Sequence, residues 1–157
     1  MVTTWSIERM VRDPATGAPI SEAPAYTITP LQVKRATLDF AAEIRELKRP
    51  KKRSMLLSMG RVSDKLQLEG TIEDSTVSMA SLEANFVLKL RNCVYHMVKL
   101  SEGTTQVMYE NTEDSSEVSS TNTWIMNTCQ IREVGGFTRH YEFTLGFVAG
   151  SYHRVFL

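Results

Sequence analysis

Three histidines and two cysteines are the side chains here best suited to a zinc or redox site, yet their spacing favours neither. His96, His140 and His153 lie far apart and form no HxH or HExxH pattern. Cys93 and Cys129 belong to no CxxC pattern and are too few for a disulfide framework. Spacing alone does not decide whether the two are bridged, and two reduced, buried thiols are the expectation. The sequence therefore predicts no metal and no cofactor.

Acid–base and nucleophilic chemistry also lack a matching set of residues. Asp39 and Glu43 could serve as paired carboxylates, but four residues along a strand span about 13 Å, too far for one carboxylate to shift the pKa of the other. The chain has no GxSxG pattern and no glycine-rich phosphate loop, and many of its serines gather in the polar run SSEVSS. We predict that the protein is not an enzyme.

The densest charge in the chain is the basic run RELKRPKKRS at 45–54, which could bind nucleic-acid phosphates. Its basic residues are Arg45, Lys48, Arg49, Lys51, Lys52 and Arg53. The run lacks aromatic residues for base stacking, and Pro50 interrupts any helix or strand at its centre. We expect it to form the solvated tip of a hairpin. The alternative function is a nucleic-acid-binding β-barrel module that uses residues 45–53.

An acidic and polar segment, ENTEDSSEVSSTN at 110–122, is expected to form a long loop. Its acidic residues are Glu110, Glu113, Asp114 and Glu117. If this loop lies at the end of the subunit opposite the basic tip, the two charged segments meet whenever copies stack head to tail. Head-to-tail contacts build rings or filaments, and matched charges set their register. The basic and acidic residues are therefore the candidate contacts between stacked copies.

The residues on both sides of the basic run predict a long antiparallel hairpin. Leu38 and Phe40 alternate with polar residues before the run, and Leu66 and Leu68 do so after it. Apolar residues of the first half also fall at helical spacing, which is the rival interpretation. The clear alternation of the second half favours two strands over 33–72.

The remaining elements are one helix and several strands. An amphipathic helix is predicted over 78–91, begun by Thr76 or Ser78 and carrying the apolar stripe Met79, Leu82, Phe86 and Leu90. Short strands are expected over 94–100 and 106–109, and a second hairpin over 123–134 and 138–149 across Gly135-Gly136.

The first thirty residues read as an extended arm and loop with little core of their own, which leaves 31–157 as the folded domain. A strand-like pattern at 4–12 is followed by the proline- and glycine-containing loop DPATGAP. The sum of elements is mainly β with one α-helix, an antiparallel β-sandwich or partly closed barrel with a helix at its side.

Composition is that of an ordinary globular chain. Its 157 residues suffice for one domain with a core, and 18 basic against 18 acidic residues give a formal net charge of zero. That balance argues against a dedicated nucleic-acid binder and tolerates self-association. The N-terminus lacks the apolar run of a signal peptide, and no stretch approaches the roughly 20 apolar residues of a membrane helix. We therefore expect a protein made in the cytosol, which could act outside the cell when carried in a particle.

The order of these parts resembles the tail-tube fold of tailed phages, archaeal tailed viruses and related injection systems. A polar hairpin connection is followed by SMGRVSDKLQLEGTIED, an amphipathic helix, and strand pairs ending in NTWIMNTCQIREVGGFTRHYEFTLGFVAG. The resemblance spans roughly residues 30 to 150 and is one of pattern.

The resemblance implies a structural virion protein of the tail tube, the baseplate or the tail tip. Such subunits form stacked rings, typically of six, whose hairpins join into one β-barrel around a channel for DNA and a tape-measure protein. Leu38, Phe40, Leu66 and Leu68 would then pack against the helix stripe on one hairpin face. The other face would line the lumen with Asp39, Glu43, Lys65, Gln67 and Glu69.

Overall fold

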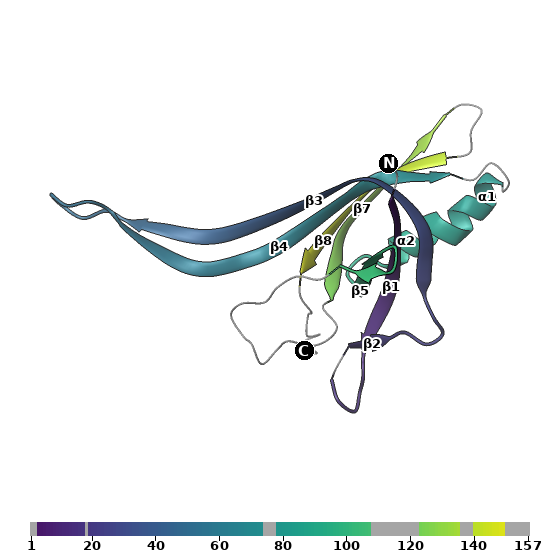
Figure 1. Ribbon diagram of the computed structural model, residues 1–157, viewed down its shortest axis with the longest axis horizontal. Helices are drawn as coiled ribbons and strands as arrows, with labels where there is room; N and C mark the ends of the chain where they lie inside the picture. Colours follow the sequence, from purple (N-terminus) through teal and green to yellow (C-terminus); the bar gives the residue numbers. More distant parts are fainter. Residues whose placement is uncertain (1–2, 18, 74–77, 108–122, 136–139, 150–157) are drawn as a thin grey trace.

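Six antiparallel strands close into a barrel with one helix at its side (Figure 1). The computed structural model describes residues 3–17, 19–73, 78–107, 123–135 and 140–149. The barrel strands are β1 (Thr3–Arg12), β3 (Thr27–Leu47), β4 (Met55–Glu73), β5 (Met97–Glu102), β7 (Trp124–Val134) and β8 (His140–Ala149). They follow the order β1-β3-β4-β8-β7-β5, and pairing of β1 with β5 completes the circle. The predicted mainly β class with one flanking helix is confirmed.

The barrel interior is filled by the apolar residues that alternate along these strands. Leu66 and Leu68 of β4 and Phe143, Leu145 and Phe147 of β8 are each at most 2% exposed. The side chains between them point out of the barrel, as the period of two requires. Burial of a side chain of this size contributes roughly 1.5–3 kcal/mol, so this interior is the main source of stability.

Gly70 lets the backbone of β3 approach β4 closely. A Cβ on Gly70 would collide with the Gln32 carbonyl group and with the Phe143 ring. The register between the two strands shifts nearby, between Val33 and Arg35. A bulge of this kind bends the strand, which is how a sheet turns the corner of a barrel.

The predicted helix is confirmed, with a π-helical stretch at its centre. It consists of α1 (Met79–Leu82), η1 (Glu83–Val87) and α2 (Leu88–Asn92). The Ser78 side chain caps its start by accepting a hydrogen bond from the Ser81 backbone N–H at 3.2 Å. Of the predicted stripe, Leu82 and Leu90 are fully buried, and Met79 and Phe86 pack partly buried against the core.

The expectation that residues 1–30 have little core of their own is wrong for β1. Trp5 and Ile7 are 4% and 0% exposed, and β1 pairs with both β3 and β5. Of the described N-terminal strands, β2 (Pro19–Ser21), which pairs with the end of β1, lies outside the barrel circle. β1 matters because, among the described strands, it is the one that joins β3 to β5 and so closes the barrel.

Among the shorter elements, β6 (Thr105–Gln106) forms a small hairpin with β5. The acidic segment 110–122 and the last residues of the chain lie outside the described residues. The predicted second hairpin is confirmed in β7 and β8, while its turn also lies outside them.

Candidate functional site

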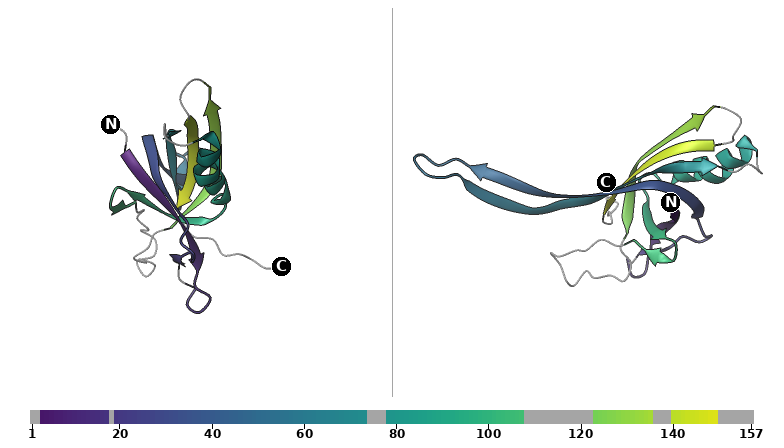
Figure 2. Two further views of the ribbon diagram at one scale, coloured as in Figure 1. Left: turned by 90° about the vertical axis from the view of Figure 1, so that its right-hand side faces the viewer. Right: turned by 45° about the horizontal axis from the view of Figure 1, so that its top comes forward.

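The most distinctive feature is the ribbon formed by β3 and β4, which runs far beyond the barrel (Figures 1 and 2). The predicted hairpin is thus confirmed, and its strands extend over 21 and 19 residues. Residues directly opposite each other in an antiparallel pair point to the same face. We call the side that continues the barrel interior the inner face, and the opposite side the outer face.

The inner face carries apolar side chains along its length, but it also holds the buried Asp64 opposite Phe40 and the exposed Glu46 opposite Leu56. Leu66 is 2% exposed, whereas Leu38 directly opposite is 51% exposed and Phe40 is 59% exposed. The expectation that Leu38 and Phe40 pack against the helix is therefore wrong, because both lie on the part of β3 that has left the barrel. Ile44 and Leu56, further out on the same face, are 59% and 67% exposed.

The outer face is polar near the barrel and carries four of the five residues predicted to line a lumen. Lys65, Gln67 and Glu69 alternate along β4, and Asp39 lies opposite Lys65 on β3. Arg35 adds an ion pair with Glu69 at 3.7 Å, and the Gln67 amide donates a hydrogen bond to Glu69 at 3.0 Å. Glu43 belongs to β3, but its side chain is not among those described.

The polar character of the outer face ends toward the tip. Between the pairs Ala41–Ser63 and Ile44–Ser58, β4 has two more residues than β3, so the ribbon contains bulges there. Beyond them the outer face carries three apolar residues, each 39–47% exposed: Leu47, Met55 and Leu57. Both faces of the ribbon therefore carry exposed apolar side chains at its outer end, next to Arg45 on the outer face and Glu46 on the inner face. Sequence reasoning missed this, although the unbroken run Met55-Leu56-Leu57 is the signal of a strand buried on both faces.

Both long edges of the ribbon lack strand partners in the described part of the chain. β1 pairs with β3 no further than Val33, and β8 pairs with β4 no further than Lys65. In the described residues, no further strand pairs with the outer edges of 34–47 and 55–64. Such edges are templates for adding another strand.

The tip of the ribbon gathers the basic residues, as predicted. Arg45, Lys48, Arg49, Lys51, Lys52 and Arg53 are all exposed at or next to the turn. The Arg49 guanidinium donates two hydrogen bonds to the Arg53 carbonyl oxygen, at 3.0 and 3.2 Å. Their predicted acidic partners, Glu110, Glu113, Asp114 and Glu117, lie outside the described residues.

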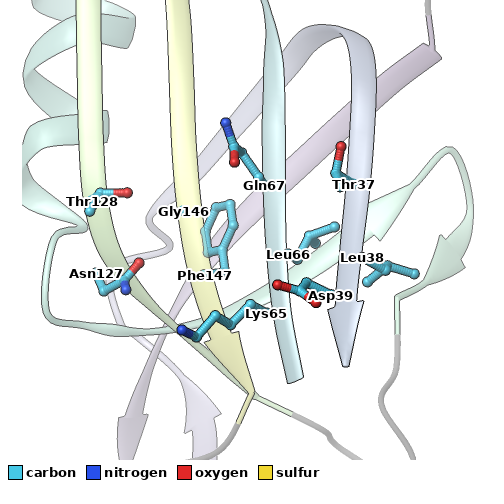
Figure 3. A pocket seen from close by; sticks show the side chains of 10 residues that line it. All are labelled: Thr37, Leu38, Asp39, Lys65, Leu66, Gln67, Asn127, Thr128, Gly146 and Phe147. Atoms are coloured by element: carbon cyan, nitrogen blue, oxygen red, sulfur yellow. The ribbon is translucent and has the colours of Figure 1, made fainter. Parts of the chain in front are cut away.

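A pocket of about 350 Å³ lies where the ribbon leaves the barrel (Figure 3). Asn127 and Thr128 of β7 border one side and Thr37 and Asp39 of β3 the other, with Gly146 of β8 between them. A Cβ on Gly146 would collide with the Thr128 hydroxyl, so the glycine keeps this place open. The lining holds one carboxylate and one amine, with no histidine or cysteine. It offers polar contacts for another surface and no set of groups for catalysis.

A second group of charges ties the N-terminal segment to the helix. The Arg9 guanidinium forms an ion pair with Glu22 at 2.8 Å and stacks 4.5 Å from the centre of the Tyr26 ring. The Tyr26 hydroxyl donates a hydrogen bond to the Lys89 carbonyl oxygen at 3.2 Å. Because Arg9 is partly buried, this group of contacts stabilises the barrel wall. The spacing of these residues in the sequence did not predict it.

Burial shifts the pKa values of the cysteines and of His96. Both cysteines are free, and burial raises the pKa of Cys93 to about 12. Burial, followed by the nearby Arg9 charge, lowers the pKa of His96 below its usual value. In the described residues no group of three or more potential ligands could hold a metal ion. No helix in the same part of the chain has the length and hydropathy of a membrane span.

No family model and no curated protein sequence matches the chain. Among solved structures, the chain is similar to the sheath/tube terminator of the extracellular contractile injection system PVC in its extended state. That match has 8% identity and a TM-score of 0.39 and covers 94% of this chain and 90% of the other. The chain is also similar to a protein of the six-fold symmetrised baseplate of the anti-feeding prophage, at 15% identity and a TM-score of 0.38, covering 94% and 89%.

Proposed function

We propose that the protein is a structural subunit that assembles with copies of itself into rings through the β3–β4 ribbon. The observation that carries this proposal is the ribbon itself. Its inner face exposes Leu38, Phe40, Ile44 and Leu56, and in the described residues no further strand pairs with its edges over 34–47 and 55–64. A long, open, apolar edge is a hazard for a solitary soluble protein. It is an advantage for a subunit whose neighbours complete the sheet.

Rotational symmetry matches the two open edges to each other. In a ring, every ribbon runs in the same direction, so β3 of one copy faces β4 of the next. These two strands are antiparallel, and their pairing would continue the antiparallel order of the barrel. Such an interface is heterologous and closes when the rotation between copies completes a circle.

The finer proposal is a stacked ring of six in the tail tube, baseplate or tail tip of a virus-like particle. The outer faces of the ribbons would line a channel, with Asp39, Glu43, Lys65, Gln67 and Glu69 toward the lumen. Opposite charges on this face lie next to each other, as in the Arg35–Glu69 ion pair, which leaves a lining with little net field. That suits DNA and a tape-measure protein that pass through without being held. The subunit would assemble in the host cytoplasm and end in the virion tail.

Assembly of the purified chain tests the proposal. Sedimentation velocity over rising concentrations, followed by negative-stain electron microscopy, should show rings or tubes with an axial hole. Replacing residues 42–62 with Asn-Gly, a pair suited to a tight hairpin turn, should leave a folded monomer. Wild-type protein that stays monomeric at the highest concentration would contradict the proposal.

Nucleic-acid binding through 45–53 is the competing function, and the exposed basic tip is the observation that favours it. It predicts duplex binding that weakens with salt and with alanine at Lys51, Lys52 and Arg53. Binding that is absent, or unchanged by these substitutions, leaves ring assembly as the function.

A further inference from the structure

The outer end of the ribbon differs from the rest of it because it exposes apolar side chains on both faces. Ile44 and Leu56 occupy its inner face, and Leu47 and Leu57 its outer face, all between 39% and 67% exposed. Nearer the barrel the outer face is polar, so a single layer of neighbouring ribbons suffices there. A ribbon with exposed apolar side chains on both faces, next to Arg45 and Glu46, buries them when it is inserted between two protein layers that pair with the charges.

The end of the barrel that lies opposite the ribbon tip gathers carboxylates. Glu73 ends β4, Glu133 lies near the end of β7, and Glu83 belongs to the helix that starts at the same end (Figure 1). Glu133 stands opposite Tyr141 on the neighbouring strand, and burial, followed by the charges of Glu133 and Glu83, raises the pKa of Tyr141. Arg132 stands opposite Glu142 on the neighbouring strand, so these two charges offset each other.

In the described residues this barrel end carries more carboxylates than basic groups, whereas the tip with Lys51, Lys52 and Arg53 is basic. The two ends of one molecule are complementary in charge.

We propose that the outer end of the ribbon inserts into the acidic barrel end of a second copy, as an axial contact between stacked rings. This inference rests on the proposed ring function and names the surface through which one ring meets the next. The tip would approach Glu73, Glu83 and Glu133 of the second copy, while the apolar residues behind it become buried. Charge steers the two ends together, and the apolar surface supplies most of the affinity.

Neither a membrane nor DNA provides what this ribbon end requires. A bilayer could take up Leu47 and Leu57 but cannot pair the open strand edges, and deep insertion would carry the basic tip into lipid. DNA would match the tip charge but would leave the apolar residues on both faces in water. A protein partner with an acidic surface can bury the apolar residues and also match the charge of the basic tip. The barrel end of a second copy of this chain is such a surface.

Charge exchange between the two ends tests the contact in the full chain. Lys51→Glu with Lys52→Glu, both on exposed side chains, should raise the concentration needed for stacking at least tenfold. Glu73→Lys with Glu133→Lys should do the same, and the four substitutions together should restore stacking. Arg91→Glu, on the exposed surface of α2, is the control and should change nothing. Sedimentation velocity measures stack length, and electron microscopy separates single rings from stacks.

Single rings from either double variant, with stacks regained in the fourfold variant, support the axial contact. Stacks that form unchanged in both double variants overturn this inference while the proposed ring function stands. If the variant with Lys51→Glu and Lys52→Glu still stacks but no longer binds a DNA duplex, the tip is a nucleic-acid surface and the inference is overturned. Wild-type protein that forms no rings overturns both.

Discussion

Leu38 and Leu66 stand directly opposite each other on β3 and β4, yet Leu66 is 2% exposed and Leu38 is 51% exposed. The two side chains point to the same face of one ribbon, which leaves the barrel between them. This pair therefore marks the boundary between the surface that folds the subunit and the surface that is left for other copies.

Substitution of this pair should separate folding from assembly. Leu66→Ala should lower the free energy of unfolding by roughly 2–4 kcal/mol, because it leaves a cavity in the core. Leu38→Ala should lower it by less than about 0.5 kcal/mol, since the side chain is half in water. Urea unfolding of the dilute monomer measures both. Equal losses would mean that the barrel interior extends past Leu38.

Polar substitution further out on the inner face should act on assembly alone. Phe40→Ser should leave the melting temperature of the dilute chain within about 2 °C, because 59% of the residue's surface is already exposed. The same change should weaken association, since a neighbouring copy can no longer bury the ring. Concentration series by sedimentation velocity give the measurement. Arg91→Ser, on the exposed surface of α2, is the control and should leave association unchanged.

Sequence pattern predicted which face each ribbon residue occupies but not what covers that face. Leu38 and Phe40 alternate as regularly as Leu66 and Leu68, so all four appeared to belong to one core. The alternation records only that a side chain avoids water. Whether the cover comes from the same chain or another copy depends on where β1 and β8 stop pairing, which no local pattern encodes.

The N-terminal strand shows a second limit of local pattern. Trp5 and Ile7 were assigned to an arm because a loop with two prolines separates them from the rest. Their partners on β5 lie more than ninety positions away in the sequence, as in the pair Ile7–Leu100. Barrel closure is such a long-range pairing. The helix stripe and the β7–β8 hairpin were predictable because their periodicities are local.

Gly70 should tolerate no side chain. In Gly70→Ala, the added methyl group would meet the Gln32 carbonyl group, and backbone cannot move aside as a flexible side chain does. We expect a loss of roughly 1–3 kcal/mol of unfolding free energy, by the cost of overpacking. Gly135→Ala is the control, because nothing lies within 4 Å of its Cβ position. The melting temperature of Gly70→Ala should be lower than that of Gly135→Ala. Equal melting temperatures would contradict the close approach of β3 to β4 at Gly70.

The Arg9–Glu22 ion pair should be worth more than a surface pair. Its side chains are 16% and 25% exposed, and the Arg9 guanidinium also stacks on Tyr26. Arg9→Ala and Glu22→Ala should each cost roughly 1–3 kcal/mol, and the double variant less than the sum. A double-mutant cycle in urea gives the coupling energy. The Arg35–Glu69 pair, 73% and 38% exposed, is the comparison and should couple by at most about 0.5 kcal/mol.

Cys93 should make the subunit less stable in alkaline solution. Burial raises the pKa of its thiol from 9.0 to about 12, so the folded chain keeps the proton that the unfolded chain releases. The neutral thiol therefore contributes stability that is fully present below pH 9 and is lost as the pH rises from 9 toward 12. Unfolding free energy measured at pH 8, 9 and 10 should fall more steeply for wild type than for Cys93→Ala, which has no thiol to ionise. Lysine and tyrosine titrations are common to both proteins and cancel in the comparison. Parallel pH profiles would show that the Cys93 thiol is open to water in the folded state.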